Sequence, residues 1–507
     1  MSEWIEYIFR SSLDPSQAFF FNRFDFWIFF TVMVFFYSFI YKIPVARNLY
    51  LTVFSLFFYF KSGGMYFLLL LFSTLVDYFI GKKLYTAPSQ RRKKFLVAAS
   101  VIINLSVLAY FKYAFFFVEN INAWLGTNFY AVDIFAQMAN SFSGVNFSIE
   151  NIFLPIGISF YTFQTISYSI DVYRGHVKPV NNILDFAFYV SFFPQLVAGP
   201  IVRASDFVPQ IYRKYEVSRE DMSRALFLIL SGMVKKILIA DYLGANFVGG
   251  VFDDPAKYTG FQNLMAIYGF ALQIYGDFSG YTDIAIGIAL LLGFRLPLNF
   301  NSPYKAINIT DFWRRWHISL SSWLRDYLYI PLGGNRKGKF NTYRNLIITM
   351  ILGGLWHGAA WRFMFWGTMH GMALASHKLY TTFIPQDRLR GRVWDILAGV
   401  ITFHFVCFCW VFFAAKDMNA GWLMINQIFT NFYASLIPET IVGYKYVFLV
   451  MIFGFVVHLF PTKWKHSYTN IFVAMPDFAK VSVMAATAIF LYQVMSSDIQ
   501  PFIYFQF

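Results

Sequence analysis

Long apolar runs separated by short basic loops repeat along the chain, and this pattern constrains the fold more than any single motif. The chain has 507 residues, of which 58% are hydrophobic and 13% charged, and its mean hydropathy is +0.51. Soluble domains carry about one quarter charged residues. The first apolar run, 24–41, is long enough to span a membrane. We therefore predict an all-α polytopic membrane protein with about 11–13 membrane-embedded segments, at about twenty residues per span.

The basic residues lie in the short loops and predict which side of the membrane each loop occupies. Lys and Arg concentrate in 82–94, 203–219 and 305–344, whereas 118–151 contains neither residue. Cytoplasmic loops are enriched in Lys and Arg, so we place the first three inside and 118–151 outside. The net charge of +14 therefore reflects membrane orientation, and we expect no nucleic-acid partner because no basic patch sits on a soluble domain. The acidic start of the chain, which lacks a positive region, predicts no cleavable signal peptide.

The chain divides into three parts by its motifs, without internal repeats or a soluble domain. We expect N-terminal transmembrane helices in 1–150, a catalytic core in 151–380 and C-terminal transmembrane helices in 381–507. Cys407 and Cys409 lie two residues apart in an apolar run. They do not face each other on a helix, so we interpret them as buried apolar residues, with no disulfide and no metal site.

The segment 187–200 is short, and both of its flanks are basic. It contains Pro194, Gly199 and Pro200. Because both flanks are predicted to be cytoplasmic, the segment is either a re-entrant element or a pair of spans counted as one. Non-helical backbone at membrane depth is tolerated where it is buried in protein or lines a cavity.

The segment 311–326, DFWRRWHISLSSWLRD, predicts an amphipathic helix at the membrane surface. Its tryptophans and leucines recur at three- and four-residue spacing. Thr310 or Asp311 is a suitable N-cap. One interpretation is an interfacial anchor with no further role.

A second interpretation places a binding site on the same segment. His317, next to Trp316, would face the site, while Arg314 and Arg315 would recognise an anion such as a phosphate-bearing carrier. Trp316, Arg314 and Arg315 are accordingly candidate substrate-binding residues.

The segment 352–371, LGGLWHGAAWRFMFWGTMHG, places His357 and His370 in an apolar run. Ionisable groups at membrane depth are costly and mark candidate functional sites. On one straight helix the two histidines would be about 20 Å apart, so a shared site needs a break at Gly358 or Gly367. Basic residues on both sides of the run favour a hairpin. The small residues around His357 allow either close helix packing or room for a substrate.

Two carboxylates, Asp277 and Asp283, lie in the apolar segment 275–283, YGDFSGYTD. They could satisfy one another and the backbone of a broken helix, or line a hydrophilic funnel. The second interpretation makes Asp277 a candidate substrate-binding residue.

The motifs together resemble the membrane-bound O-acyltransferase family. The matching stretches are LPIGISFYTFQTISYSIDVYRG, FFPQLVAGPIVR, YGDFSGYTDIAIG, DFWRRWHISLSSWLRDYLYIPLGGNR and WHGAAWRFMFWGTMHG, in that order between 154 and 371. More narrowly, they are similar to the bacterial branch with the alginate O-acetylation membrane protein, the peptidoglycan O-acetyltransferases and the teichoic-acid D-alanylation membrane protein.

The resemblance implies a fold, a site and a reaction. The fold would be a ring of membrane helices around a central tunnel, in the cytoplasmic membrane of a bacterium. The family's characteristic histidine carries over to His357 and its second histidine to His317. His357 would act as general base on an acceptor hydroxyl, and His317 would position the thioester or stabilise its oxyanion. Trp356, next to the first histidine, becomes a candidate substrate-binding residue.

The resemblance also implies the substrates and partners. An acyl group, taken as acetyl, would pass from a cytoplasmic thioester to an extracytoplasmic polysaccharide such as alginate or peptidoglycan, with a separate extracytoplasmic acetyltransferase protein completing the transfer. The donor would be acetyl-CoA or a carrier-protein thioester, with no bound cofactor. A transient acyl-histidine or acyl-serine is an open alternative to direct transfer. A polytopic transporter or polysaccharide export subunit is the alternative class, since such proteins also contain broken helices and buried carboxylates.

Overall fold

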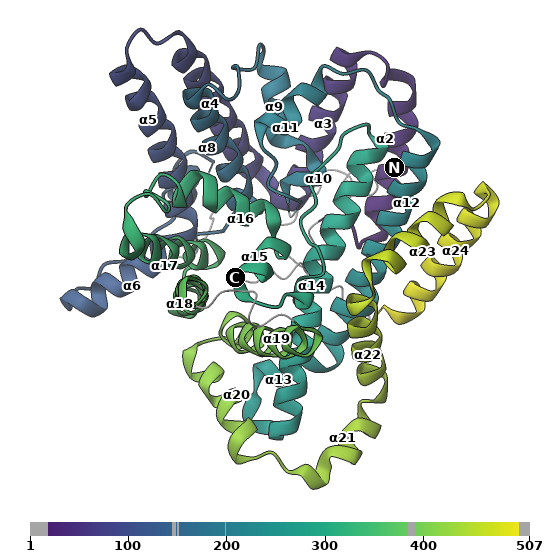
Figure 1. Cartoon of the computed structure of the whole chain (residues 1–507). Coiled ribbons are helices and arrows are strands. Elements are labelled where there is room, and N and C mark those ends of the chain that lie inside the picture. Colours follow the sequence, from purple (N-terminus) through teal and green to yellow (C-terminus); the bar gives the residue numbers. More distant parts are fainter. Residues whose placement is uncertain (1–18, 144–148, 150–151, 198, 384–390, 496–507) are drawn as a thin grey trace.

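The structure, a computed structural model, describes residues 19–143, 149, 152–197, 199–383 and 391–495 (Figure 1). The described residues form helices and connecting turns, with no strand. The N-terminal residues on which the signal-peptide prediction depends lie outside this part of the chain. The first helices along the chain are α2 (Phe24–Ile40), α3 (Pro44–Gly63), α4 (Phe67–Thr86), α5 (Gln90–Leu108), α6 (Ala114–Leu125), α7 (Ile134–Ser143) and α8 (Ile158–Arg174), the last of which already belongs to the predicted core.

The core and the C-terminal part continue this all-α organisation. The core helices are α9 (Ile183–Ser191), α10 (Phe193–Leu196), α11 (Ala204–Ile211), α12 (Arg219–Met233), α13 (Gly249–Asp253), α14 (Gly260–Leu291), α15 (Ile309–Arg315), α16 (Ile318–Leu324), α17 (Gly338–His357) and α18 (Trp361–Phe383). The C-terminal helices are α19 (Arg392–Ala414), α20 (Met418–Thr430), α21 (Ile437–Gly443), α22 (Lys445–Leu459), α23 (Thr462–Ala474) and α24 (Asp477–Val494).

Several helical stretches are suited to a membrane by length and composition. Among the described residues, four stretches are long and apolar enough to cross one: Pro44–Thr86, Gln90–Leu125, Arg392–Ala414 and Asp477–Val494. The pair Ala434–Gly443 and Lys445–Leu459, bent by 89°, provides a fifth if it is one broken span. The predicted all-α polytopic class is confirmed. The count of 11–13 embedded segments, which includes shorter and more polar helices, stays a prediction.

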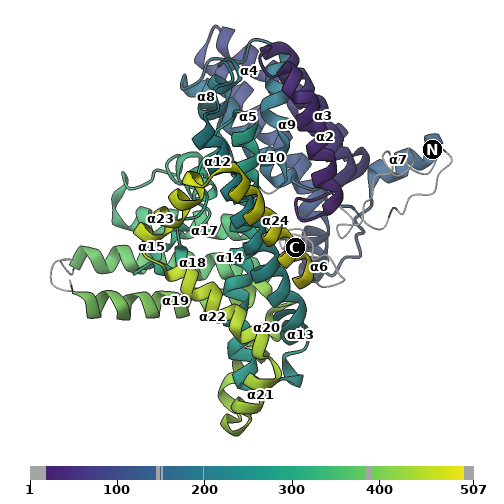
Figure 2. The same ribbon diagram turned by 90° about the vertical axis from the view of Figure 1, so that its right-hand side faces the viewer.

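The long helix α14 runs through the middle of the molecule in both views (Figures 1 and 2). A capping box begins it, in which Thr259 and Gln262 each accept a hydrogen bond from the other's backbone N–H. Glycines then allow α12 to approach closely: a Cβ on Gly232 would lie 2.5 Å from the carbonyl oxygen of Gly280. The glycines of the YGDFSGYTDIAIG motif therefore serve backbone-to-backbone packing.

The segment containing α9, α10 and α11 is re-entrant. Asn48, near the start of α3, donates a hydrogen bond of 3.0 Å to Asp185 in the first turn of α9. Its neighbour Arg47 donates one of 2.6 Å to the carbonyl oxygen of Ile211, the last residue of α11. The chain therefore enters and leaves at the same end of α3. The helix α9 has nine residues and α10 has four, too few for either to cross a membrane, so the structure favours a re-entrant element over two complete spans.

The helices α17 and α18 form a hairpin, and they pack closely against each other along their length. The helix α17 ends at His357, and Gly358 leaves it with extended backbone angles. A Cβ on Gly371 would lie 2.8 Å from the Cα of Ile347, so the glycines permit close approach of the two helices. The predicted hairpin is confirmed. Of the two predicted break positions, Gly358 is the one at which α17 ends, whereas Gly367 lies within α18.

The predicted amphipathic helix over 311–326 is wrong in two respects. Asn308, rather than Thr310 or Asp311, is the N-cap of α15. The helix also stops at Arg315, because His317 adopts left-handed backbone angles (φ 42°), and α16 begins after it. The tryptophans of this segment are buried, so it belongs to the core and is not an interfacial anchor.

Candidate active site

His357 lies at the tip of the α17–α18 hairpin. Its side chain is buried, with 3% of its surface exposed. Trp361, the first residue of α18, donates a hydrogen bond of 3.0 Å to Asn120 of α6. Asn120 belongs to the segment without Lys or Arg that is predicted to be extracytoplasmic, whereas the hairpin starts from a basic loop. The tip with His357 therefore lies toward the predicted extracytoplasmic side.

His317 is fixed by Asn299. The side-chain oxygen of Asn299 accepts hydrogen bonds from the backbone N–H of Ser319 at 3.1 Å and from the hydroxyl of Ser319 at 2.9 Å. The same oxygen lies 3.1 Å from Nδ1 of His317. Because the Ser319 N–H can only donate, the Asn299 atom must be its oxygen, and Nδ1 of His317 must carry the proton. Nε2 of His317 then holds the lone pair, and it has no hydrogen-bond partner among the described residues.

Tryptophan rings connect the three buried histidines. The ring of Trp356 lies 5.0 Å from that of His357 and 6.2 Å from that of His317. The ring of Trp366 lies 5.1 Å from His357 and 4.7 Å from His370. The hairpin thus gathers residues that a straight helix would hold about 20 Å apart.

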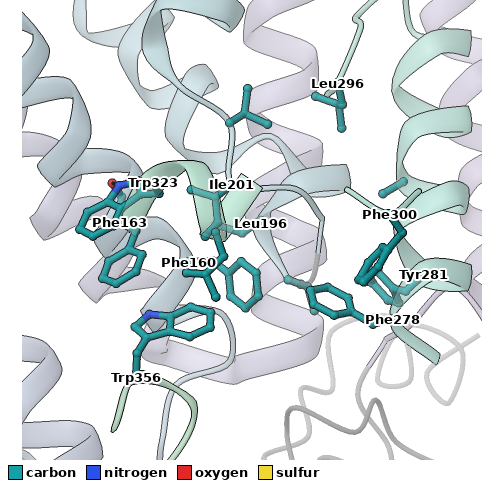
Figure 3. Close-up of a cluster of buried hydrophobic side chains, with 14 of the residues drawn as sticks. Phe160, Phe163, Leu196, Ile201, Phe278, Tyr281, Leu296, Phe300, Trp323 and Trp356 are labelled. Atoms are coloured by element: carbon teal, nitrogen blue, oxygen red, sulfur yellow. Dashed lines mark hydrogen bonds between the residues drawn. The ribbon is translucent and has the colours of Figure 1, made fainter. Parts of the chain in front are cut away.

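Trp356, whose ring lies near two of these histidines, belongs to a cluster of buried aromatic and aliphatic side chains (Figure 3). The rings of Phe163 and Trp323 stack at 3.7 Å, and Phe163 also stacks on Trp356 at 5.3 Å. Phe278 lies across the cluster, beyond Leu196 of the re-entrant segment (Figure 3). The His317 ring contacts Phe278 at 4.6 Å as well as Trp356. His317 therefore lies between Phe278 and Trp356, and its side chain is fully buried from solvent.

Two cavities approach the histidines from different sides. The larger, of 620 Å³, is lined by Arg314, Ile318, Arg325, Met350 and Lys378 among others, and several of these come from loops predicted to be cytoplasmic. The smaller, of 140 Å³, is lined by Trp356 and His357 together with 153–160, which follows the predicted extracytoplasmic segment. Ile318, which lines the larger cavity, directly follows His317 in the chain, so this cavity lies close to the backbone of His317.

The other predicted site residues fall in different places. Arg314 lines the larger cavity, and Arg315, ion-paired with Asp311 at 2.9 Å, lines a neighbouring hollow of 380 Å³ that Arg314 also borders. Trp356 lines the smaller cavity. Trp316 is buried against other rings, including Trp410 at 5.0 Å, and lines neither of the two cavities.

Asp277 belongs to a buried ionic group rather than to either cavity. Its carboxylate lies 2.6 Å from Nζ of Lys236, which also pairs with Asp241 at 2.7 Å. Asp283 pairs with Lys235 at 2.5 Å. These pairs join α14 to the π-helical turn after α12, Val234–Asp241. These contacts are structural, but the predicted partners are wrong: the two carboxylates pair with lysines rather than with one another, and α14 is continuous through the motif.

A charged cluster anchors the segment after α16, outside the spans. Asp326 accepts hydrogen bonds of 2.6 Å from both Arg203 and Arg325. Burial alone would raise the pKa of Asp326, but these hydrogen bonds outweigh it and hold the pKa below its usual value. Arg174 and Arg203 also pack over the ring of Tyr327. Two basic segments that are predicted to be cytoplasmic, 203–219 and 305–344, thus meet Arg174 at one point.

Sequence reasoning missed two residues of the site. Asn299 is separated from His317 by 18 positions in a loop, and no pattern marks it. Lys112 donates hydrogen bonds of 2.7 Å and 3.0 Å to the carbonyl oxygens of Trp356 and His357. The sequence does mark Lys112 as a candidate, since it is a single lysine in the apolar run 107–118 and so an ionisable group at membrane depth.

A buried histidine at the tip of a helical hairpin, with a second buried histidine nearby and two cavities of opposite predicted orientation, is the arrangement that the sequence resemblance implies. The chain belongs to the MBOAT, membrane-bound O-acyltransferase family, whose model matches residues 11–416. It is a multi-pass membrane protein and an O-acyltransferase, which sets aside the transporter alternative.

Three relatives from bacteria carry acyltransferase activities in their names. The chain is 38% identical over 406 residues to the peptidoglycan O-acetyltransferase of Helicobacter pylori, covering 75% of this chain and 73% of that protein. It is 42% identical over 388 residues to the probable alginate O-acetylase AlgI of Pseudomonas aeruginosa, covering 76% and 70%. A teichoic acid D-alanyltransferase of Bacillus subtilis is 31% identical over 281 residues, covering 52% and 69%.

Proposed function

We propose that this O-acyltransferase moves an acetyl group from a cytoplasmic thioester to a hydroxyl on the extracytoplasmic side of a bacterial cytoplasmic membrane. The observation that carries the proposal is that the group of His357, Trp356 and His317 adjoins two cavities of opposite predicted orientation. Trp356 and His357 line the smaller cavity, and Ile318, the neighbour of His317 in the chain, lines the larger one. At such a site the donor would bind from one side of the membrane and the acceptor from the other. The acyl group would then cross the membrane by transfer between them, without an open path for ions.

The donor would occupy the larger cavity. Arg314, Arg325 and Lys378 supply positive charge there, and arginine forms strong bidentate contacts with phosphate groups. The volume of 620 Å³ lies within the range of ligand sites, about 300–1,000 Å³. We assign acetyl-CoA as the donor, and a thioester on a carrier protein is the alternative.

His357 would act as the general base. Its imidazole takes the proton from the acceptor hydroxyl while the hydroxyl oxygen attacks the thioester carbonyl carbon. The tetrahedral intermediate then expels the thiolate, which receives that proton from the imidazolium, so the products are an ester and a free thiol. General base catalysis typically contributes about 10²- to 10⁴-fold.

His317 would position the donor. Because its Nδ1–H is used by Asn299, the neutral ring has only a lone pair at Nε2 and cannot donate to an oxyanion from that atom. This tautomer favours the positioning role over oxyanion stabilisation. The left-handed backbone of His317 is a local strain of the kind found at functional sites.

The acceptor would be a hydroxyl of an extracytoplasmic polysaccharide, reached directly or through a separate extracytoplasmic acetyltransferase protein. The names of the relatives from Helicobacter pylori and Pseudomonas aeruginosa support a cell-surface polymer such as peptidoglycan or alginate.

The test uses the full chain in nanodiscs with acetyl-CoA labelled on the acetyl group. We expect His357→Ala to slow thioester loss by about 10²- to 10⁴-fold. The control is His404→Ala, which removes a histidine on the exposed side of α19. Normal turnover in His357→Ala would remove His357 from the mechanism, and label retained on the protein would favour a covalent intermediate.

If wild-type protein turns over no acetyl-CoA even with an extracytoplasmic acceptor protein present, a carrier-protein thioester is tested next. Turnover with that donor alone would overturn the assignment of acetyl-CoA and leave the His357 role to be tested with the new donor.

A further inference from the structure

Lys112 is a cation from a distant part of the chain that meets the end of α17. It lies in the π-helical turn Ala109–Tyr113, between α5 and α6. Its ammonium nitrogen lies 2.7 Å from the carbonyl oxygen of Trp356 and 3.0 Å from that of His357. The side chain also lines the smaller cavity and lies 5.9 Å from the centre of the Trp356 ring.

These contacts meet a specific need of the helix end. The last carbonyl groups of a helix have no partner within it, and a positive charge at this end interacts favourably with the helix dipole. Tyr113, the next residue, donates a hydrogen bond of 2.9 Å to the carbonyl oxygen of Leu355. Two adjacent residues therefore hold the three successive carbonyls that end at His357.

The contacts bear on the position of the His357 side chain. The chain leaves α17 directly after His357, at Gly358, so no further helical turn fixes this residue from its C-terminal side. A misplacement of about 1 Å at a reacting group can cost about 100-fold in rate.

We propose that Lys112 is a positioning residue for acyl transfer. Its hydrogen bonds hold the end of α17 in place, so that His357 faces the smaller cavity. The inference rests on the proposed role of His357 as the base. Lys112 acts through His357, and it does not exchange a proton in the reaction.

The experiment compares Lys112→Met and Lys112→Arg with a matched control in the nanodisc assay. The control is Lys465→Met, because Lys465 also bonds a carbonyl oxygen near a helix end, that of His458 in α22, at 2.8 Å. We expect Lys112→Met to lower kcat by about 10- to 100-fold while the KM for acetyl-CoA changes by less than about twofold. Lys112→Arg should recover part of the loss, because it restores a cation with donors. Lys465→Met should keep the wild-type kcat.

A double variant separates positioning from general destabilisation. Effects that act through one group are not additive. Adding Lys112→Met to His357→Ala should therefore not lower the residual thioester loss further. An additional tenfold fall, or an equal fall of kcat in Lys465→Met, would overturn the proposal in favour of a structural role.

The outcomes also separate this inference from the proposed function. Full turnover in His357→Ala would refute the role of His357 itself. Loss of turnover in His357→Ala with wild-type kcat in Lys112→Met would refute only the positioning role. If Lys112→Met does not fold, Lys112→Gln takes its place, since glutamine keeps one donor group without the charge. Wild-type kcat in that variant would count against the positioning role of Lys112.

Discussion

Replacement of Asn299 by alanine tests how the second histidine is held. The side-chain oxygen of Asn299 is the acceptor for the backbone N–H of Ser319, the hydroxyl of Ser319 and Nδ1 of His317. Asn299→Ala removes all three hydrogen bonds from a fully buried position. His317 is then free to adopt the other tautomer and to relax from its left-handed backbone conformation.

The expected magnitude follows from these three bonds. Each hydrogen bond contributes about 1 kcal/mol net, so their loss amounts to about 3 kcal/mol. If this energy serves to hold His317 in its working orientation, the corresponding loss of rate is about 100-fold, at about 1.4 kcal/mol per factor of ten.

The assay measures turnover per folded molecule, with Asn263→Ala as the control. Asn263 is equally buried and donates hydrogen bonds to the carbonyl oxygens of Pro255, Tyr258 and Thr259, at the start of α14. Both variants should lower the melting temperature in detergent, but only Asn299→Ala should lose turnover. Turnover within about twofold of wild type in Asn299→Ala would refute the argument.

Three further predictions concern packing and charge. Gly358→Ala should destabilise the protein by about 1–3 kcal/mol, because a Cβ there would clash with a buried phenyl ring, whereas Gly443→Ala meets nothing within 4 Å and should melt normally. Asp277→Asn should lower the melting temperature by breaking the buried pair with Lys236, and turnover per folded molecule should stay constant; a selective fall in turnover would instead support the predicted substrate-binding role. Because the folded pKa of Asp326 lies below its usual value of about 3.9, its stabilisation is present above that pH and is lost as the pH falls through the folded pKa. The melting temperature of the wild type should therefore fall further than that of Asp326→Asn between about pH 5 and pH 3. An equal fall in the two proteins would contradict this.

Local patterns predicted the parts of the fold that depend on composition and charge. The apolar runs predicted the helices, and the basic loops on both sides of 352–371 predicted the hairpin, because charge decides which loop ends share a side of the membrane. For the short segment with Pro194 and Gly199, charge predicted only that both ends share a side, and a re-entrant element and a pair of spans both satisfy this. In each case the signal lies within a few residues of the feature.

Long-range contacts within the site could not be predicted in this way. The break at His317 depends on Asn299, which reaches it through the fold, and the periodicity of the segment favoured one continuous helix instead. Lys112 lies 245 positions before His357, and only the packed structure brings it to the end of α17.

The helix α17 is a shared wall of the two cavities. Met350 lines the larger one and His357 the smaller, and seven residues of helix separate them by about 10 Å. If the donor occupies the larger cavity and His357 is the base, as proposed, a donor that shifts α17 at Met350 also shifts the base at His357. Affinities for the two substrates are then linked, and linkage is reciprocal: a bound donor that favours acceptor binding is itself held more tightly once the acceptor is present.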